Sequence, residues 1–247
     1  MRQESHQWQS TRSFWCVIRM GTTLSSSPLG IDALKDQLSK FNKSFGFIEE
    51  LKEGDINIVD DWTETTADGG SHSISNGRVD CKSNSTLNGT CRLQLNQVFS
   101  NANISMMNLS SSMFKKLVVE WNMKVGNIGN FDETKSIVGM TSTDVADRDT
   151  NGVCGFIVDG GVLKCLVDDG GVESLSGDIG GVVSDYNLYR IEMDTETRFY
   201  KNQTLIHTAP GTLTGGLEYF MIHAKNDTTA NAYLSWFGLR IYFEEMD

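Results

Sequence analysis

The sequence predicts an all-β protein, a two-sheet antiparallel sandwich preceded by a short helical segment at its N-terminal side. Three observations support this fold class. Beyond Asp55 the chain consists of short runs in which apolar and polar residues alternate, which is the pattern of half-buried strands. Proline is scarce, with 2 residues, whereas 24 glycines are available for tight turns. Because no long helical stretch separates the strands, a parallel β-α-β architecture is disfavoured.

The pattern divides the chain into three parts. Residues 1–27 are expected to be an N-terminal extension, residues 28–54 an amphipathic helix, and residues 55–247 the sandwich domain. The longest apolar run near the start, residues 14–18, is too short for a membrane span or for the apolar core of a signal peptide. We therefore expect no membrane span and no standard export signal at this N-terminus.

The helix is predicted from its start signal and its periodicity. Ser27 and Pro28 are typical of an N-cap followed by proline at the first helical position. Gly46 interrupts the pattern that follows. In this pattern apolar residues recur at spacings of three and four, at Ile31, Leu34, Leu38, Phe41, Phe45 and Ile48. Two interpretations stay open: the helix packs on the sandwich, or residues 31–48 form a short stalk through which the chain makes a homo-oligomer.

Strands are predicted along the rest of the chain. Alternation is clearest in residues 117–125, 189–193 and 239–243. Shorter strands are expected near residues 73–82, 91–98, 135–142, 153–158, 162–167, 198–201, 204–208 and 217–224. About a dozen short strands separated by turns are typical of a two-sheet sandwich.

The cysteines predict two local disulfides. If Asp159 and Gly160 form a two-residue hairpin turn, Cys154 lies directly opposite Cys165, within reach of a disulfide. Two further cysteines flank a turn-rich stretch and would form the second pair, with Cys16 left over; these two are Cys81 and Cys91. The alternative is that the four paired residues are reduced cysteines of the core.

Charge and surface motifs narrow the class of partner. The net charge of −11 repels nucleic acid and anionic lipid, so a nucleic-acid partner is not expected. Seven Asn-x-Ser/Thr sequons begin at Asn42, Asn84, Asn88, Asn103, Asn108, Asn202 and Asn226. They predict either a glycosylated, surface-displayed protein or a chain in which Asn, Ser and Thr fill turns.

Residues 187–208 carry a resemblance to a known family. The run Tyr-Arg-Ile-Glu, a turn, Phe-Tyr-Lys-Asn and His-Thr resembles the paired strands of concanavalin A-like lectin/glucanase domains, which include laminin G-like modules. The resemblance covers roughly residues 55–247 and implies a jelly-roll sandwich. Gln203 stands where the family usually has glycine. The family contains lectins, laminarinase-type glycosidases, and phage and viral surface proteins, so fold alone does not select a function.

One candidate site consists of carboxylates. Glu192, Asp194 and Glu196 match the Glu-x-Asp-x-Glu spacing of laminarinase-type retaining glycosidases, in which two carboxylates about 5–5.5 Å apart perform catalysis. In that family, however, the motif lies on an earlier strand. Glu196 is also expected to lie in the hairpin turn that precedes Arg198. The alternative is a solvated strand face with ordinary ion pairs.

Two further candidates concern ligands. Asp147, Asp149 and Asn151 place oxygen ligands as in the first half of a calcium loop, but Val158 occupies the position that needs glutamate, which excludes an EF-hand. The loop is therefore either a Ca²⁺ site completed by other carboxylates or a polar turn. Two aromatic residues near a strand start would form a sugar-binding platform or pack in the core: Tyr233 and Trp236.

The sequence therefore predicts a non-enzymatic, lectin-like surface module that binds a glycan or another cell-surface partner. We expect it in a virion or an extracellular appendage, with no required cofactor other than Ca²⁺ if the loop at residues 147–151 binds it. Two alternatives stay open: a laminarinase-type glycoside hydrolase, and a purely structural virion or fibre subunit.

Overall fold

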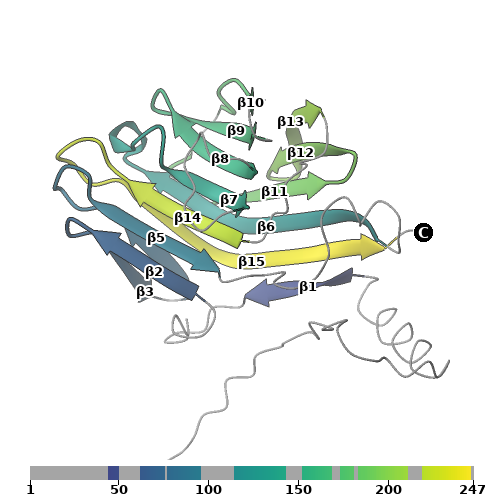
Figure 1. The fold of residues 1–247 in the computed structure, drawn as a ribbon, viewed down its shortest axis with the longest axis horizontal. Helices are drawn as coiled ribbons and strands as arrows, with labels where there is room; N and C mark the ends of the chain where they lie inside the picture. Colours follow the sequence, from purple (N-terminus) through teal and green to yellow (C-terminus); the bar gives the residue numbers. More distant parts are fainter. Residues whose placement is uncertain are drawn as a thin grey trace, which may run out of the picture.

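The computed structural model describes residues 44–49, 62–75, 77–95, 114–142, 152–168, 173–180, 183–210 and 219–245. In these ranges the chain forms two antiparallel sheets stacked face to face (Figure 1). The one helical element of this part is a single 3-10 turn, Ile128–Asn130. The predicted two-sheet antiparallel sandwich is therefore confirmed. Among the described residues no helix is long and apolar enough to cross a membrane.

The first sheet, sheet A, has 8 strands in the order β13-β12-β11-β6-β15-β4-β3, with β1 also paired to β15. Its strands are β1 (Ser44–Glu49), β3 (Ser71–Ser75), β4 (Arg78–Lys82), β6 (Phe114–Gly126), β11 (Asn187–Met193), β12 (Glu196–Lys201), β13 (Thr204–Pro210) and β15 (Tyr233–Glu245). The two long strands β6 and β15 run side by side through the middle of this sheet (Figure 1).

The second sheet, sheet B, has 7 strands in the order β10-β9-β8-β7-β14-β5-β2. Its strands are β2 (Trp62–Ala67), β5 (Thr90–Leu95), β7 (Ile137–Thr141), β8 (Val153–Asp159), β9 (Val162–Asp168), β10 (Glu173–Leu175) and β14 (Tyr219–Lys225). The pairings between the described strands are antiparallel in both sheets, as the sequence predicted when it showed no crossover helices.

The inner faces of the two sheets form the core. Aromatic rings from both sheets meet at its centre: Trp121 of sheet A lies 5.7 Å from Phe156 and 5.3 Å from Phe220 of sheet B, measured between ring centroids. Tyr189 stacks on Trp121 from the neighbouring strand β11, at 6.3 Å. Edge and offset contacts at these separations are favourable for aromatic pairs. The alternation in residues 117–125 and 189–193 thus correctly identified the core-facing side chains.

The helix prediction is wrong for residues 44–49. Residues 44–49 form strand β1, which pairs with residues 239–244 of β15, with Phe45 opposite Phe243. Gly46 disfavours a helix, and the edge of β15 offers hydrogen-bond partners to an extended chain. A continuous helical stalk over residues 31–48 is therefore excluded. The extension 1–27 and residues 28–43 and 50–54 of the predicted helix lie outside the described residues.

The β8–β9 hairpin turns one residue later than the sequence predicted. Its turn residues are Gly160 and Gly161, at φ 64° and 71°, a conformation that glycine adopts without steric cost. Cys165 consequently faces Phe156, not Cys154. The predicted disulfide depended on Cys154 lying directly opposite Cys165, and this prediction is wrong. Both cysteines are free, buried thiols.

The β12–β13 turn explains the departure at Gln203. Asn202 and Gln203 both have positive φ, 50° and 67°, as a tight hairpin turn of this kind requires. Asn202 is held by its own hydrogen bonds: its Oδ1 accepts from the Leu188 amide at 2.9 Å. Gln203 is exposed. Its backbone has the left-handed conformation, in which a side chain has a steric cost.

We expect Gln203→Gly to stabilise the protein by about 0.5–1 kcal/mol, because glycine has no side chain to clash at this φ. Urea unfolding of the variant beside the wild type measures the difference. A decrease in the free energy of unfolding would show that the turn does not have this conformation.

Candidate functional site

The prediction that Tyr233 and Trp236 form a sugar-binding platform is wrong for Trp236. Trp236 is fully buried on the inner face of β15, with its ring 5.3 Å from that of Trp62. Tyr233 lies on the outer face, half-buried, and its ring covers Gly126 of β6, where an added Cβ would collide with it. Trp236 is thus a core residue, while Tyr233 belongs to the surface.

A β-bulge is the physical reason for this placement. The register of β15 against β6 shifts between Phe237 and Arg240, and Gly238 has φ 66°. One extra residue in a strand reverses the inward and outward alternation on its two sides. Trp236 and Leu239 therefore both face the core although three positions separate them. Simple alternation extended backward from residues 239–243 would have placed Trp236 outside.

Tyr233 is one part of a larger surface cluster that we call the aromatic–cation patch: Arg78, Lys124, Tyr186, Tyr233 and Phe237. These residues come from β4, β6, the segment before β11, and β15, and they meet on the outer face of sheet A. The Arg78 guanidinium lies 4.8 Å from the Tyr186 ring centroid and 5.9 Å from that of Phe237. Lys124 Nζ lies 5.1 Å from the Tyr186 ring and 5.7 Å from the Tyr233 ring.

The centre of the patch is fixed by tight local packing. Tyr186 Oη and Ser235 Oγ are hydrogen-bonded at 2.6 Å, and Ser235 is only 1% exposed. The Tyr186 and Phe237 rings meet edge to face with centroids 5.2 Å apart. Cation–π contacts hold flexible cationic side chains over such rings and reduce the entropy that they lose on binding a ligand.

Both cations of the patch lack a carboxylate partner among the described residues, since the contacts of Arg78 and Lys124 are with aromatic rings. The neighbouring Lys82 differs, because its Nζ pairs with Asp80 at 3.4 Å. In a chain with a net charge of −11, two such cations held together over aromatic rings are a local concentration of positive charge.

The carboxylates of the predicted catalytic site form ion pairs with arginine and lysine side chains of the same chain. Glu192 lies on the outer face of β11, and its side chain is 9% exposed. Its carboxylate contacts Arg190 Nη2 at 2.5 Å, Lys116 Nζ at 3.2 Å and Arg198 Nε at 3.6 Å. Tyr200 Oη donates a further hydrogen bond at 3.2 Å.

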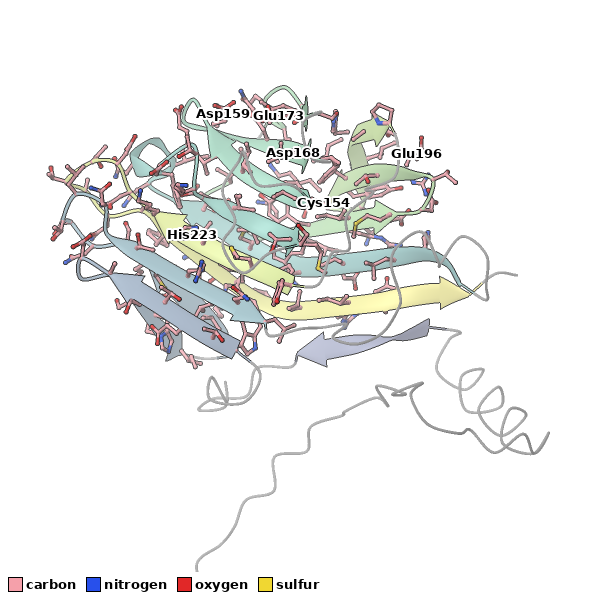
Figure 2. All side chains as sticks on the ribbon, viewed as in Figure 1. Cys154, Asp159, Asp168, Glu173, Glu196 and His223 are labelled. Carbon is pink, nitrogen blue, oxygen red and sulfur yellow. The ribbon has the colours of Figure 1, made fainter. Side chains whose placement is uncertain are left out.

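The other two carboxylates of the motif bind the same cation. Arg198 donates to Asp194 Oδ2, and its Nη1 donates to Glu196 Oε1 at 2.7 Å. Glu196 is the first residue of β12 (Figure 2), not a turn residue as the sequence predicted. All three side chains therefore lie around one guanidinium.

This network gives Glu192 and Asp194 the wrong acidity for acid catalysis. Partial burial would raise the pKa of Glu192, but the charges of Arg190 and Lys116 outweigh it and hold that pKa below its usual value. The pKa of Asp194 is likewise lowered, since the Glu196 amide and Arg198 outweigh its burial. A glycosidase acid needs a raised pKa, so the arrangement is that of an ion-pair network.

The calcium-type loop, with Asp147, Asp149 and Asn151, lies outside the described residues. Cys16 and the sequons at residues 42, 103 and 108 lie outside them as well. Of the described sequons, Asn226 cannot carry a glycan in the folded chain. It is fully buried, and its Nδ2 donates to the carbonyl oxygens of residues 84 and 230, at 2.5 Å and 3.0 Å.

Sheet B carries a buried histidine. His223 of β14 (Figure 2) is 7% exposed, and neither of its ring nitrogens has a hydrogen-bond partner in the described part of the chain. Burial lowers its pKa to about 4, from an ordinary 6.5, with a further decrease from nearby positive charges that Asp132 only partly offsets. The charges that face it are Arg92, Lys225, Asp132 and Lys135.

This histidine predicts a loss of stability in acid. Between the two pKa values the unfolded chain binds a proton that the folded chain excludes, so the free energy of unfolding falls as the pH decreases. From pH 7 to pH 5 we expect His223 to contribute a loss of about 2 kcal/mol. Urea unfolding at both pH values, for the wild type and for His223→Leu, measures it. An equal loss in the variant would contradict this assignment.

Comparisons with known proteins support the fold. No family model matches the sequence, and no curated protein matches it. A botulinum neurotoxin type C structure, whose cell entry is described as dependent on interaction with two ganglioside molecules, matches at TM-score 0.53 and 12% identity, over 85% of this chain and 50% of that one. The botulinum neurotoxin DC binding domain in complex with rat synaptotagmin II matches at TM-score 0.53 and 12% identity, over 81% and 48%.

A third matching structure is covered over most of its own length. A protein of unknown function from Shewanella oneidensis MR-1 matches at TM-score 0.50 and 13% identity, over 82% of this chain and 87% of that one. The present chain spans about half the length of the neurotoxin chains. At these identities the likeness shows a shared two-sheet sandwich fold, and it assigns no residue a role.

Proposed function

We propose that this chain is a non-enzymatic binding module that recognises an acidic glycan of a cell surface through the aromatic–cation patch. The observation that carries the proposal is the pair of cations, Arg78 and Lys124, held over aromatic rings on the outer face of sheet A. Arginine and lysine bind carboxylate or sulfate groups by charge-assisted hydrogen bonds. Tyr233 and Phe237 add apolar surface on which a sugar ring can pack.

The fold supports the same class of function. The sandwich resembles the receptor-binding domains of botulinum neurotoxins, one of which is described as depending on gangliosides and another as bound to synaptotagmin II. A rigid two-sheet frame suits a binding module, because it holds side chains from separate strands in fixed positions. We further propose an extracellular or virion-surface location, where such a ligand is met.

The glycosidase alternative finds less support in the geometry. Arg198 pairs with Glu192, Asp194 and Glu196, and the pKa values of Glu192 and Asp194 are lowered, so neither of these two carboxyl groups is prepared to donate a proton at neutral pH.

A glycan array probed with the full chain, with Ca²⁺ and with a chelator, tests the proposed function. We expect binding to carboxylated or sulfated glycans, weaker binding to their neutral counterparts, and a decrease in binding at high salt because the attraction is electrostatic. Binding that requires Ca²⁺ would point instead to the loop at residues 147–151. Exclusive binding to neutral glycans would contradict the proposed acidic ligand, and no binding would contradict the proposal and favour a structural subunit.

A further inference from the structure

Two buried thiols from different sheets lie close together at one end of the sandwich. Cys81 belongs to β4 of sheet A, and Cys91 belongs to β5 of sheet B. Both are free cysteines in the structure, so the disulfide that the sequence predicted between them is not formed there, and both are 0% exposed on the inner faces of their sheets. The Cys81 Sγ–H donates to the Cys91 carbonyl oxygen at 2.9 Å, so the Cys81 sulfur contacts the other residue directly.

The two side chains also interact with each other. Burial raises the pKa of the Cys81 thiol well above its usual value, and a hydrogen bond with the Cys91 side chain raises it further. The Cys81 sulfur is therefore in contact with Cys91 across the two sheets. A disulfide needs Cβ atoms about 3.5–4.5 Å apart, and two cysteines whose atoms are already in contact are candidates for one.

The second pair of cysteines lacks this geometry. Cys154 faces Val167 and Cys165 faces Phe156, so the two cysteines are diagonal neighbours on β8 and β9. Diagonal positions of an antiparallel pair have Cα atoms about 7–8 Å apart, which exceeds the range of an unstrained disulfide. The two pairs thus differ although both join strands that are consecutive in the chain.

Partly exposed polar residues lie next to Cys81. His72 of β3 is its direct partner across the sheet, and the His72 Nδ1 is 2.6 Å from Glu64 Oε1 of β2. These two side chains are 22% and 29% exposed and lie at the edge of the sandwich. Cys81 therefore lies one strand in from the edge of sheet A, beside partly exposed polar side chains.

We propose that Cys81 and Cys91 form a disulfide that joins the two sheets when the chain folds under oxidising conditions, and that Cys154 and Cys165 stay reduced. With glutathione disulfide as oxidant, one cysteine thiolate attacks it and releases one glutathione. The second cysteine thiolate then attacks the mixed disulfide and releases another. The chain loses two hydrogen atoms, and one glutathione disulfide becomes two glutathione molecules.

The bond forms during folding, because the native thiols are buried and the raised pKa of Cys81 leaves little thiolate. Since the bridge closes a loop over a sequence separation of 10, we expect it to raise the thermal midpoint by about 5–10 °C relative to reduced protein. This inference is independent of glycan binding.

Peptide mapping of the full chain tests the proposal. The protein is refolded with a glutathione redox mixture, free thiols are alkylated, and trypsin is added without reductant. We expect peptides 79–82 and 83–92 to appear as one disulfide-linked species, and a count of three free thiols, which is the five cysteines of the chain less the two bridged. Peptides 79–82 and 83–92 released separately and alkylated would overturn the proposal.

Matched variants sharpen the result. We expect Cys91→Ala to abolish the reductant-sensitive part of the thermal midpoint, and Cys154→Ala to retain it. If either variant fails to fold, the wild-type peptide map still decides. A linked species containing Cys154 or Cys165 would also overturn the assignment.

Discussion

Replacing Trp236 with alanine is expected to destabilise the protein by about 3–5 kcal/mol, the range measured when large aromatic side chains are removed from cores. The ring is fully buried and packs on Trp62 from the opposite sheet, so its removal leaves a cavity between the two sheets. Urea unfolding of the variant measures the loss. Because a domain's total stability is about 5–15 kcal/mol, a large part of it depends on this one side chain.

Two control variants separate packing from polarity. Trp236→Phe keeps an aromatic ring and removes an indole N–H that has no hydrogen-bond partner in the described part of the chain, so we expect a loss well below that of alanine. Tyr233→Ala, on the outer face of the same strand, is expected to cost about 1 kcal/mol or less. If Trp236→Ala unfolded like the wild type but lost ligand binding, the inward placement of this tryptophan would be wrong.

Removing both cations of the aromatic–cation patch is expected to weaken binding to an acidic glycan by about 100-fold. Each charge-assisted hydrogen bond contributes about 1.5–3 kcal/mol, and about 1.4 kcal/mol corresponds to a tenfold change in affinity. Arg78→Ala and Lys124→Ala should therefore each weaken binding by at least about tenfold. Titration with the best acidic ligand of the glycan array measures both single variants and the double variant.

The chain offers a matched control on the same face of sheet A. Arg240 is exposed and pairs with Glu120, with Nη1 and Oε1 3.3 Å apart. Arg240→Ala removes the same charge from the same sheet but lies outside the patch, so we expect unchanged affinity. All of these variants should retain the wild-type thermal midpoint within about 2 °C, because charges at the surface contribute little to stability. An equal loss of affinity in Arg240→Ala would mean that overall charge, not the patch, determines binding.

The strands of the sandwich were readable from the sequence because burial on one face imposes a period of two. The run at residues 189–193 carries this period without interruption and the run at 117–125 with one exception, Val118, and they form β11 and β6 as predicted. Residues 44–49 were misread because their apolar spacing also fits a helix. These residues form a strand because they pair with the edge of β15, which is distant in the sequence.

The candidate site was less accessible to prediction. Trp236 was misplaced because the bulge at Gly238 reverses the alternation, and a single glycine does not reveal a bulge by itself. Arg78, Lys124 and Tyr186 were missed altogether. They lie on separate strands and segments that only the strand order of sheet A brings together, and no local motif marks them.

Footprinting of the bound protein tests the central claim most directly. Hydroxyl radicals label exposed aromatic side chains, and a bound ligand protects those that it covers. With a saturating acidic glycan, we predict protection of Tyr186, Tyr233 and Phe237, and unchanged labelling of Tyr200 beside the Glu192 network. Protection confined to Tyr200 or to residues of sheet B, with the patch labelled as in the free protein, would contradict the account.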